Sequence, residues 1–177
     1  MTNRLISATA ISLLLSTGIA HAGTVEIYLL DRLDNKQNGY CLDISGGQGA
    51  DADPSNGLQG HTCYSPSGQI FVDQGFDSEQ FANGVLYMPE FKVCATMAST
   101  EPGSSVGLAS CDGSETQSFV FSGEGTIVPA SATDMCLTLG EDTRSGRSDT
   151  NQIKALSLEA CSTDNAASQT WGNRGAN

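Results

Sequence analysis

Short segments in which apolar and polar residues alternate recur along the chain, and three of them carry a cysteine at the same place. They span residues 40–44, 93–97 and 135–139 and read Tyr-Cys-Leu-Asp-Ile, Val-Cys-Ala-Thr-Met and Met-Cys-Leu-Thr-Leu. Alternation with a period of two is typical of a β-strand with one buried face. Residues 152–160 could form a helix by composition, but their apolar positions also alternate, and we predict a strand. Asn-Gly pairs at 38–39, 56–57 and 83–84 predict turns, so the sequence favours an all-β fold.

Each of these segments is followed by a second cysteine, a polar loop and a Gln-x-aromatic triplet, so one pattern occurs three times. The triplet is residues 117–119 in the second repeat and 169–171 in the third. The first repeat offers two triplets, which begin at Gln69 and at Gln74. The spacing to the following glycine favours Gln74 and the spacing from the cysteine favours Gln69; we prefer Gln74 and leave Gln69 open. Units of a few short strands cannot bury an apolar face alone, but three of them can share one core.

The N-terminal segment predicts export. Residues 1–4 are polar with one positive charge, residues 5–20 are apolar, and Ala20-His21-Ala22 has the small-x-small pattern that signal peptidase cleaves. We therefore expect residues 1–22 to be a signal peptide and the mature chain to begin near Gly23, in a secreted or periplasmic location. The apolar run is short for a membrane span, so membrane insertion is not expected. After cleavage, His61 is the only histidine.

Charge narrows the range of partners. The 177-residue chain carries 8 basic and 20 acidic residues and a formal net charge of −12. Such a balance disfavours nucleic acid and anionic membrane surfaces as partners. The length suits one domain. A neutral or polar ligand, or a protein surface, is the remaining kind of partner.

The six cysteines form three pairs along the sequence. The members of the pairs are separated by 22, 17 and 25 residues. An even number of cysteines in an exported chain predicts three disulfides, although six cysteines allow 15 connectivities.

With its three cysteine pairs and three Gln-x-aromatic triplets, the sequence resembles the ricin-B-type β-trefoil lectins. The resemblance covers residues from about 25 to 172, within one domain of residues 23–177 whose repeats span about 25–77, 78–125 and 126–172. It implies a β-trefoil with one disulfide inside each repeat: Cys41–Cys63, Cys94–Cys111 and Cys136–Cys161. It also implies binding of galactose-type or other sugars without a metal or other cofactor.

The same resemblance places a sugar site in the first repeat. The family's sugar-binding Asp lies two residues after the first cysteine, its Gln four residues before the second cysteine, and its aromatic platform two residues before that cysteine. The first repeat has Asp43, Gln59 and His61 there, with His in place of the commoner Trp or Tyr. In the family, the residue before the triplet, usually Asn, also often contacts the sugar; here it is Asp73 if the triplet begins at Gln74, or Gly68 if it begins at Gln69. The candidate sugar-binding residues are therefore Asp43, Gln59, His61, Asp73 and Gln74. The other repeats keep none of the three features: their residues there are Thr96, Gly107 and Ala109, and Thr138, Ser157 and Glu159.

These residue types suit a saccharide. A carboxylate accepts hydrogen bonds from adjacent hydroxyls, a glutamine amide both donates and accepts, and a flat ring covers an apolar C–H face. A few such contacts on an open surface give an affinity on the order of millimolar. Considered singly, Asp43 could be a turn carboxylate and His61 a structural histidine; their joint occurrence at the family spacing favours a site.

Other motifs are weaker. Residues 103–107 match Gly-x-Ser-x-Gly, but the nucleophile elbow needs a strand-to-helix turn and a later histidine. Residues 51–53 begin like a calcium loop whose later ligands are missing. Pairs of acidic residues, Glu79 with Glu90 and Asp142 with Asp149, fit surface acid better than glycoside hydrolysis. We therefore predict a non-catalytic, secreted lectin domain with one site. The alternative is a degenerate trefoil that binds a protein, as a toxin-delivery subunit or a protease inhibitor.

Overall fold

A computed structural model describes residues 23–65 and 69–175, so the predicted signal peptide and Gly68 lie outside the described residues. Each repeat contributes four strands. The first has β1 (Thr24–Leu29), β2 (Tyr40–Ile44), β3 (Leu58–Thr62) and β4 (Phe76–Asp77). The second has β5 (Tyr87–Met88), β6 (Val93–Met97), β7 (Ser104–Ser110) and β8 (Phe119–Val120), followed by the short β9 (Glu124–Gly125). The third has β10 (Val128–Pro129), β11 (Met135–Ser145), β12 (Gln152–Ala160) and β13 (Trp171–Gly175).

The helices are all short. They are η1 (Pro54–Asn56), η3 (Val72–Gln74), η4 (Ser78–Asn83), η5 (Glu115–Gln117) and α1 (Ala166–Gln169). In the described residues, no helix has the length and apolar character needed to cross a membrane. The strands predicted at 40–44, 93–97 and 152–160 are confirmed, and the glycine of each predicted Asn-Gly turn has a positive φ of 71° to 74°.

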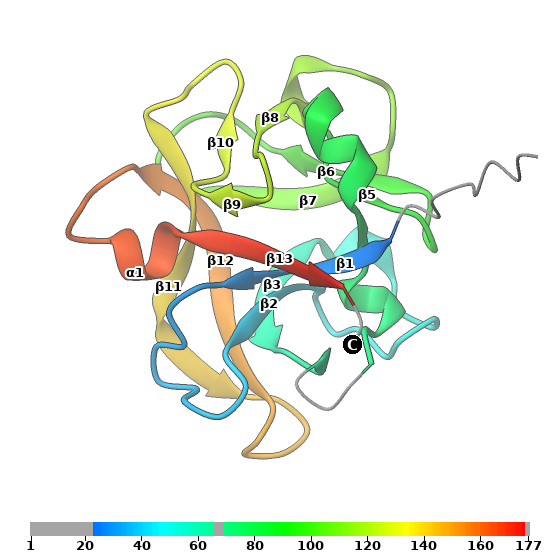
Figure 1. Ribbon diagram of the computed structural model, residues 1–177, viewed down its shortest axis with the longest axis vertical. Coiled ribbons are helices and arrows are strands. Elements are labelled where there is room, and N and C mark those ends of the chain that lie inside the picture. The colour runs from blue at the N-terminus through cyan, green and yellow to red at the C-terminus, as the bar shows by residue number, and fades with distance from the viewer. Residues whose placement is uncertain (1–22, 66–68, 176–177) are drawn as a thin grey trace, which may run out of the picture.

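Three antiparallel hairpins, β2–β3, β6–β7 and β11–β12, come together in the fold. Strand β12 pairs with β3 on one side and with β7 on the other, which joins the three hairpins. Strands β1 and β13 also pair, so the two ends of the described chain lie side by side (Figure 1). Each repeat has its own disulfide, Cys41–Cys63, Cys94–Cys111 and Cys136–Cys161, as the resemblance implied.

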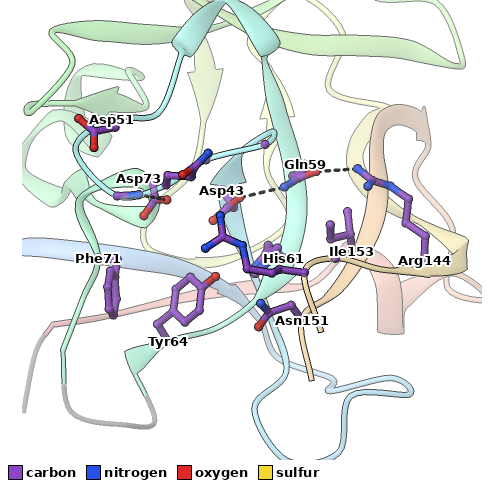
Figure 2. Close-up of a pocket in the computed structure, with 16 residues that line it drawn as sticks. Asp43, Asp51, Gln59, His61, Tyr64, Phe71, Asp73, Arg144, Asn151 and Ile153 are labelled. Atoms are coloured by element: carbon purple, nitrogen blue, oxygen red, sulfur yellow. Dashed lines mark hydrogen bonds between the residues drawn. The ribbon is translucent and has the colours of Figure 1, made fainter. Parts of the chain in front are cut away.

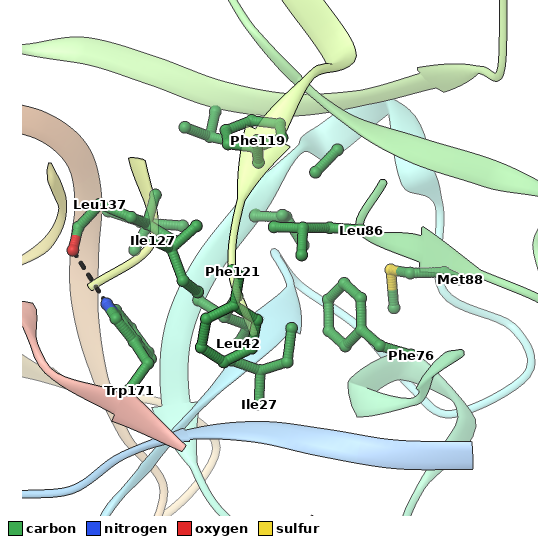
Figure 3. Close-up of a cluster of buried hydrophobic side chains, with 14 of the residues drawn as sticks. Ile27, Leu42, Phe76, Leu86, Met88, Phe119, Phe121, Ile127, Leu137 and Trp171 are labelled. Carbon is green, nitrogen blue, oxygen red and sulfur yellow. Dashed lines mark hydrogen bonds between the residues drawn. The ribbon is translucent and has the colours of Figure 1, made fainter. Parts of the chain in front are cut away.

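The core is built from the same positions of all three repeats. The aromatic residues of the triplets, Phe76, Phe119 and Trp171, are buried together with aliphatic residues from the strands (Figure 3). The Trp171 indole Nε1 donates a hydrogen bond to the Leu137 carbonyl at 2.9 Å, so its single polar group is satisfied. Burial of large aromatic side chains is a dominant stabilising contribution in such a domain.

A buried glutamine closes each repeat, and we call this side chain the glutamine latch: Gln74, Gln117 and Gln169. Each latch is the last residue of a short helix, η3, η5 or α1. Gln117 shows the pattern. Its Oε1 accepts from the Asp112 N–H at 2.9 Å, and its Nε2 donates to the Ser110 carbonyl and the Thr96 hydroxyl, both at 3.0 Å.

The other two latches make the equivalent contacts around their own disulfides. Gln74 therefore begins the triplet of the first repeat, and Gln69 is exposed. Because buried amide and carbonyl groups are costly when unpaired, one side chain with two donor hydrogens and an acceptor stabilises the whole end of each hairpin.

The latch can be tested in the second repeat, away from any candidate site. Gln117→Leu keeps the size of the side chain but leaves the Asp112 N–H and the Ser110 carbonyl without a partner. We expect the free energy of unfolding to fall by roughly 2–4 kcal/mol in urea titrations. Thr116→Ala, at the exposed neighbouring position, is the control and should stay within about 0.5 kcal/mol of wild type. Equal stability of the two variants would contradict the role of the latch.

Candidate functional site

A pocket of about 620 Å³ opens beside the first hairpin. One side is formed by the first repeat, with Asp43, Gln59, His61, Tyr64, Phe71 and Asp73 and the glycine-rich loop of residues 46–49. The other side comes from the third repeat, with Arg144, Gly146, Arg147, Asn151 and Ile153. Figure 2 shows Phe71 and Arg144 at opposite sides of this pocket, with Asp43 and His61 between them.

Asp43 lies on β2 directly opposite Gln59 on β3. Its Oδ1 accepts from Gln59 Nε2 at 3.0 Å and its Oδ2 accepts from Gln74 Nε2 at 2.9 Å. The carboxylate is 2% exposed. Burial raises the pKa of Asp43 to about 7, against the effect of the two glutamine hydrogen bonds. Asp43 is thus held rigidly and stands at the position that Thr96 and Thr138 occupy in the other repeats.

Gln59 connects Asp43 to the third repeat. Its Oε1 accepts from the Ser45 hydroxyl at 3.2 Å and from Arg144 Nη2 at 3.0 Å. Together with the bond to Asp43, these contacts fix which end of the amide is oxygen, because an arginine can only donate. The Gln59 side chain is therefore oriented from both sides.

His61 lies on β3 in register with Cys41 and is 7% exposed. Its Nδ1 lies 3.1 Å from the Thr62 carbonyl, which only accepts, so Nδ1 carries the hydrogen and Nε2 has a free lone pair. Burial lowers the pKa of His61, so the ring is neutral at pH 7. Two aromatic rings lie next to it in a row. The Tyr64 ring centroid is 5.3 Å from that of His61, and the Phe71 ring centroid is 4.8 Å from that of Tyr64.

Asp73, in η3, also lines the pocket. Its Oδ2 accepts from the Gly49 N–H at 2.8 Å, whereas its buried Oδ1 has no hydrogen-bond donor among the described residues. A Cβ at Gly47 would lie 2.8 Å from Asp73 Oδ2, so the loop needs glycine there to approach so closely. Gln74, predicted as a sugar-binding residue, is fully buried and is not among the residues that line the pocket; it donates to Asp43 and orients that side chain.

The long β11–β12 hairpin is what carries the third repeat to this pocket. Strand β11 has 11 residues, against five in β2 and in β6, and its register shifts between Leu139 and Thr143. Ile153 on β12 then pairs with His61. Sequence reasoning missed this contribution because it considered the site of each repeat separately. It missed Tyr64 and Phe71 because they lie between Cys63 and the triplet, outside the positions that the family pattern defines. The 25-residue cysteine spacing of the third repeat was the one signal of a longer hairpin.

Asp34 fastens the hairpin to the first repeat. Its carboxylate accepts from the Thr143 hydroxyl at 2.6 Å and the Tyr40 hydroxyl at 2.8 Å, and lies 3.4 Å from Lys154 Nζ. Partial burial acts to raise the pKa of Asp34, but these hydrogen bonds and the Lys154 charge outweigh it and lower the pKa to about 2. The ion pair therefore stays charged across the ordinary pH range.

In the described residues, neither the Gly-x-Ser-x-Gly motif nor the group of possible metal ligands has the geometry that its chemistry requires. Ser104 and Ser105 begin strand β7, so Gly-x-Ser-x-Gly does not form a strand-to-helix elbow. The described residues bring together one group of possible metal ligands, Glu26 with Cys41 and Cys63, and the disulfide removes both thiolates. In the third repeat, a pocket of about 850 Å³ has Thr138 at the position of Asp43, and Glu159 there accepts from Ser157.

Threefold repetition, with a glutamine latch and one disulfide per repeat, defines a β-trefoil. Beside its first hairpin lies a polar pocket with an aromatic wall. The sequence model of the ricin-type β-trefoil lectin domain matches residues 30–171. The chain belongs to this family of ricin-type β-trefoil lectin domains. No curated protein sequence matches it.

Solved structures agree on the fold. A designed threefold-symmetric protein, ThreeFoil, has a TM-score of 0.58 at 15% identity, over 85% of this chain and 97% of its own. The C-terminal half of the earthworm R-type lectin, in complex with GalNAc, has a TM-score of 0.56 at 17% identity, over 86% and 98%. The Macrolepiota procera ricin B-like lectin, in complex with lactose, has a TM-score of 0.56 at 17% identity, over 90% and 99%. The predicted β-trefoil is confirmed.

The raised pKa of Asp43 predicts a pH dependence of stability. A carboxyl whose pKa is about 7 when folded and near 3.8 when unfolded binds more protons in the folded state between these values. The stability it provides is therefore complete below pH 4 and is lost as the pH rises through 7. The loss is a few kcal/mol at most, since one pKa unit corresponds to about 1.4 kcal/mol. Asp34 titrates below this window.

Urea titrations at pH 4, 5.5, 7 and 8 measure this loss. The difference in unfolding free energy between wild type and Asp43→Asn, which cannot ionise, should shift in favour of the variant from pH 4 to pH 8. A difference that stays constant with pH would contradict the buried carboxyl.

Proposed function

We propose that the chain is a non-catalytic lectin domain that binds a galactose-type sugar in the pocket between the first and third repeats. The observation that carries the proposal is the joint presence of Asp43, Gln59 and His61 in one pocket, at the family's sugar-binding positions, with Asp73 beside them. The complexes of the earthworm lectin with GalNAc and of the Macrolepiota procera lectin with lactose support this class of ligand.

The groups in the pocket match a sugar ring chemically. Asp43 still has a free lone pair on each oxygen after its two glutamine bonds, so adjacent hydroxyls can donate to it. His61, which lines the pocket, offers Nε2 as a further acceptor. Phe71, which is 42% exposed, and Tyr64 supply flat apolar area for a C–H face. Binding needs no metal in this scheme.

We also propose that the protein is secreted or periplasmic, after cleavage near Ala22. Its three disulfides support an oxidising compartment, where such bonds persist. N-terminal sequencing of the exported protein would give Gly23 or a close neighbour as the first residue, and an intact Met1 in a mature, cell-associated protein would contradict this.

Asp43 gives the sharpest test of sugar binding. Wild type should bind galactose or lactose in titrations and on a glycan array, and Asp43→Ala should lose at least about tenfold in affinity, because charge-assisted hydrogen bonds contribute the most. Asp43→Thr should lose affinity equally while retaining the wild-type fold, because Thr96 and Thr138 accept the latch bond in the other repeats.

Thr96→Ala is the matched control: it removes the latch acceptor of the second repeat and should leave sugar affinity unchanged. If wild type and Asp43→Thr bind every sugar equally poorly, the lectin proposal is wrong. A protein-interaction module, tested by pull-down against secreted proteins and proteases, would then be the better hypothesis.

The aromatic wall predicts a second effect. Phe71→Ala should weaken sugar binding about threefold to tenfold, because stacking on an exposed ring contributes modestly. Val120→Ala, which truncates the exposed Val120 of the second repeat, should leave the affinity unchanged. Equal affinities of the two variants in calorimetric titrations would show that the sugar does not contact Phe71.

A further inference from the structure

Two arginines of the third repeat line the candidate site. Arg144 lies near the end of β11 and pairs with Ile153 on β12, and Arg147 lies in the loop that joins these strands. Both line the same pocket as Asp43 and both are exposed. The aromatic residues Tyr64 and Phe71 line this pocket as well.

Neither arginine has an acidic partner among the residues that the structure describes. Within residues 23–65 and 69–175, the ion pairs are Lys154–Asp34 and Arg174–Glu26, although the chain has 20 acidic residues. Arg144 makes one side-chain hydrogen bond, to the neutral amide of Gln59, and Arg147 makes none with the described residues. A guanidinium carries five N–H donors in a flat fork that matches a carboxylate or a sulfate. Most of these donors remain free in the pocket.

Arg144 contacts one of the proposed sugar-binding residues directly and is one side chain away from another. Arg144 Nη2 donates to Gln59, and Gln59 donates to Asp43. The substituents of a sugar ring bound to Asp43 would therefore lie within reach of the β11–β12 hairpin. A pocket of about 620 Å³ lies in the range that holds drug-sized ligands, so it has room for a charged substituent beside one hexose.

The pocket is polarised, which determines where an anion can lie. Asp43, Asp51 and Asp73 come from the first repeat, and the two arginines come from the third. Asp43 accepts two glutamine bonds and Asp73 Oδ2 accepts the Gly49 N–H, so both carboxyl groups are held on the first-repeat side of the pocket. A small free anion would be repelled by them. An anionic group attached to a sugar can instead point at the hairpin while the hydroxyls face the carboxylates.

We propose, as an extension of the proposed function, that this site prefers an acidic saccharide, one whose sugar ring carries a carboxylate or a sulfate ester. The sugar hydroxyls bind Asp43 and its neighbours, and Arg144 and Arg147 bind the anionic group.

The test compares matched ligands in calorimetric titrations of the mature protein: lactose, a sialyllactose and a sulfated lactose. We expect wild type to bind an acidic ligand about threefold to tenfold more tightly than lactose. The preference should shrink as NaCl is raised, because charge interactions are screened within about 8 Å at physiological ionic strength. Comparison of the two acidic ligands shows whether the carboxylate or the sulfate fits better, and inorganic sulfate alone should not compete.

Arg144→Gln/Arg147→Gln should bring the ratio of acidic to neutral affinity close to 1. Arg32→Gln removes the same kind of charge from an exposed position outside the pocket and should keep the wild-type ratio. A wild-type protein that binds lactose as tightly as both acidic ligands, or a double variant that keeps the preference, overturns this inference and leaves the lectin proposal intact. Loss of binding to neutral and acidic sugars alike in wild type overturns both.

Discussion

The fold depends on a buried glutamine amide at the end of each hairpin. Around each disulfide, backbone groups are withdrawn from water without a regular strand partner, and Gln74, Gln117 and Gln169 supply the missing donor and acceptor. The ring two residues further on then enters the common core. One triplet thus satisfies a polar requirement and an apolar one at adjacent positions, which explains why it can recur while most other residues of the repeats differ.

The candidate site arises from a change within this constraint. The third partner of the latch is a hydroxyl at Thr96 and Thr138, but a carboxylate at Asp43. The latch Gln74 orients one oxygen of the carboxylate and Gln59 orients the other, so the site uses rigidity that the fold already has. The cost is electrostatic: burial raises the pKa of Asp43 to about 7, so ionisation at neutral pH opposes folding. The neutral hydroxyls of Thr96 and Thr138 avoid that cost in the second and third repeats.

What could be predicted from the sequence follows from which interactions are local. Strand alternation, the Asn-Gly turns, the cysteine pairs and the latch triplets each involve residues of a single repeat, and these predictions agree with the structure. The positions relative to the cysteines and the triplet also predicted that one site contains Asp43, Gln59, His61 and Asp73. Arg144, Arg147 and the ring of Phe71 could not be found this way. Arg144 and Arg147 reach the site because β12 pairs with β3 across repeats, and that pairing depends on packing around the threefold axis rather than on a local pattern.

The asymmetry of the repeats has a physical consequence for binding. The hairpin of the third repeat is longer than the other two and is held by Asp34 through Thr143 and Lys154. It forms one side of the pocket beside the first repeat. Its own equivalent positions carry Thr138 and Glu159 instead of Asp43 and His61. A symmetric trefoil gains strength by presenting several shallow sites at once. In this chain, two repeats contribute to one pocket. The proposed sugar affinity therefore depends on the number and orientation of contacts within that pocket. Preorganisation of Asp43 by the latch reduces the entropy lost when those contacts form.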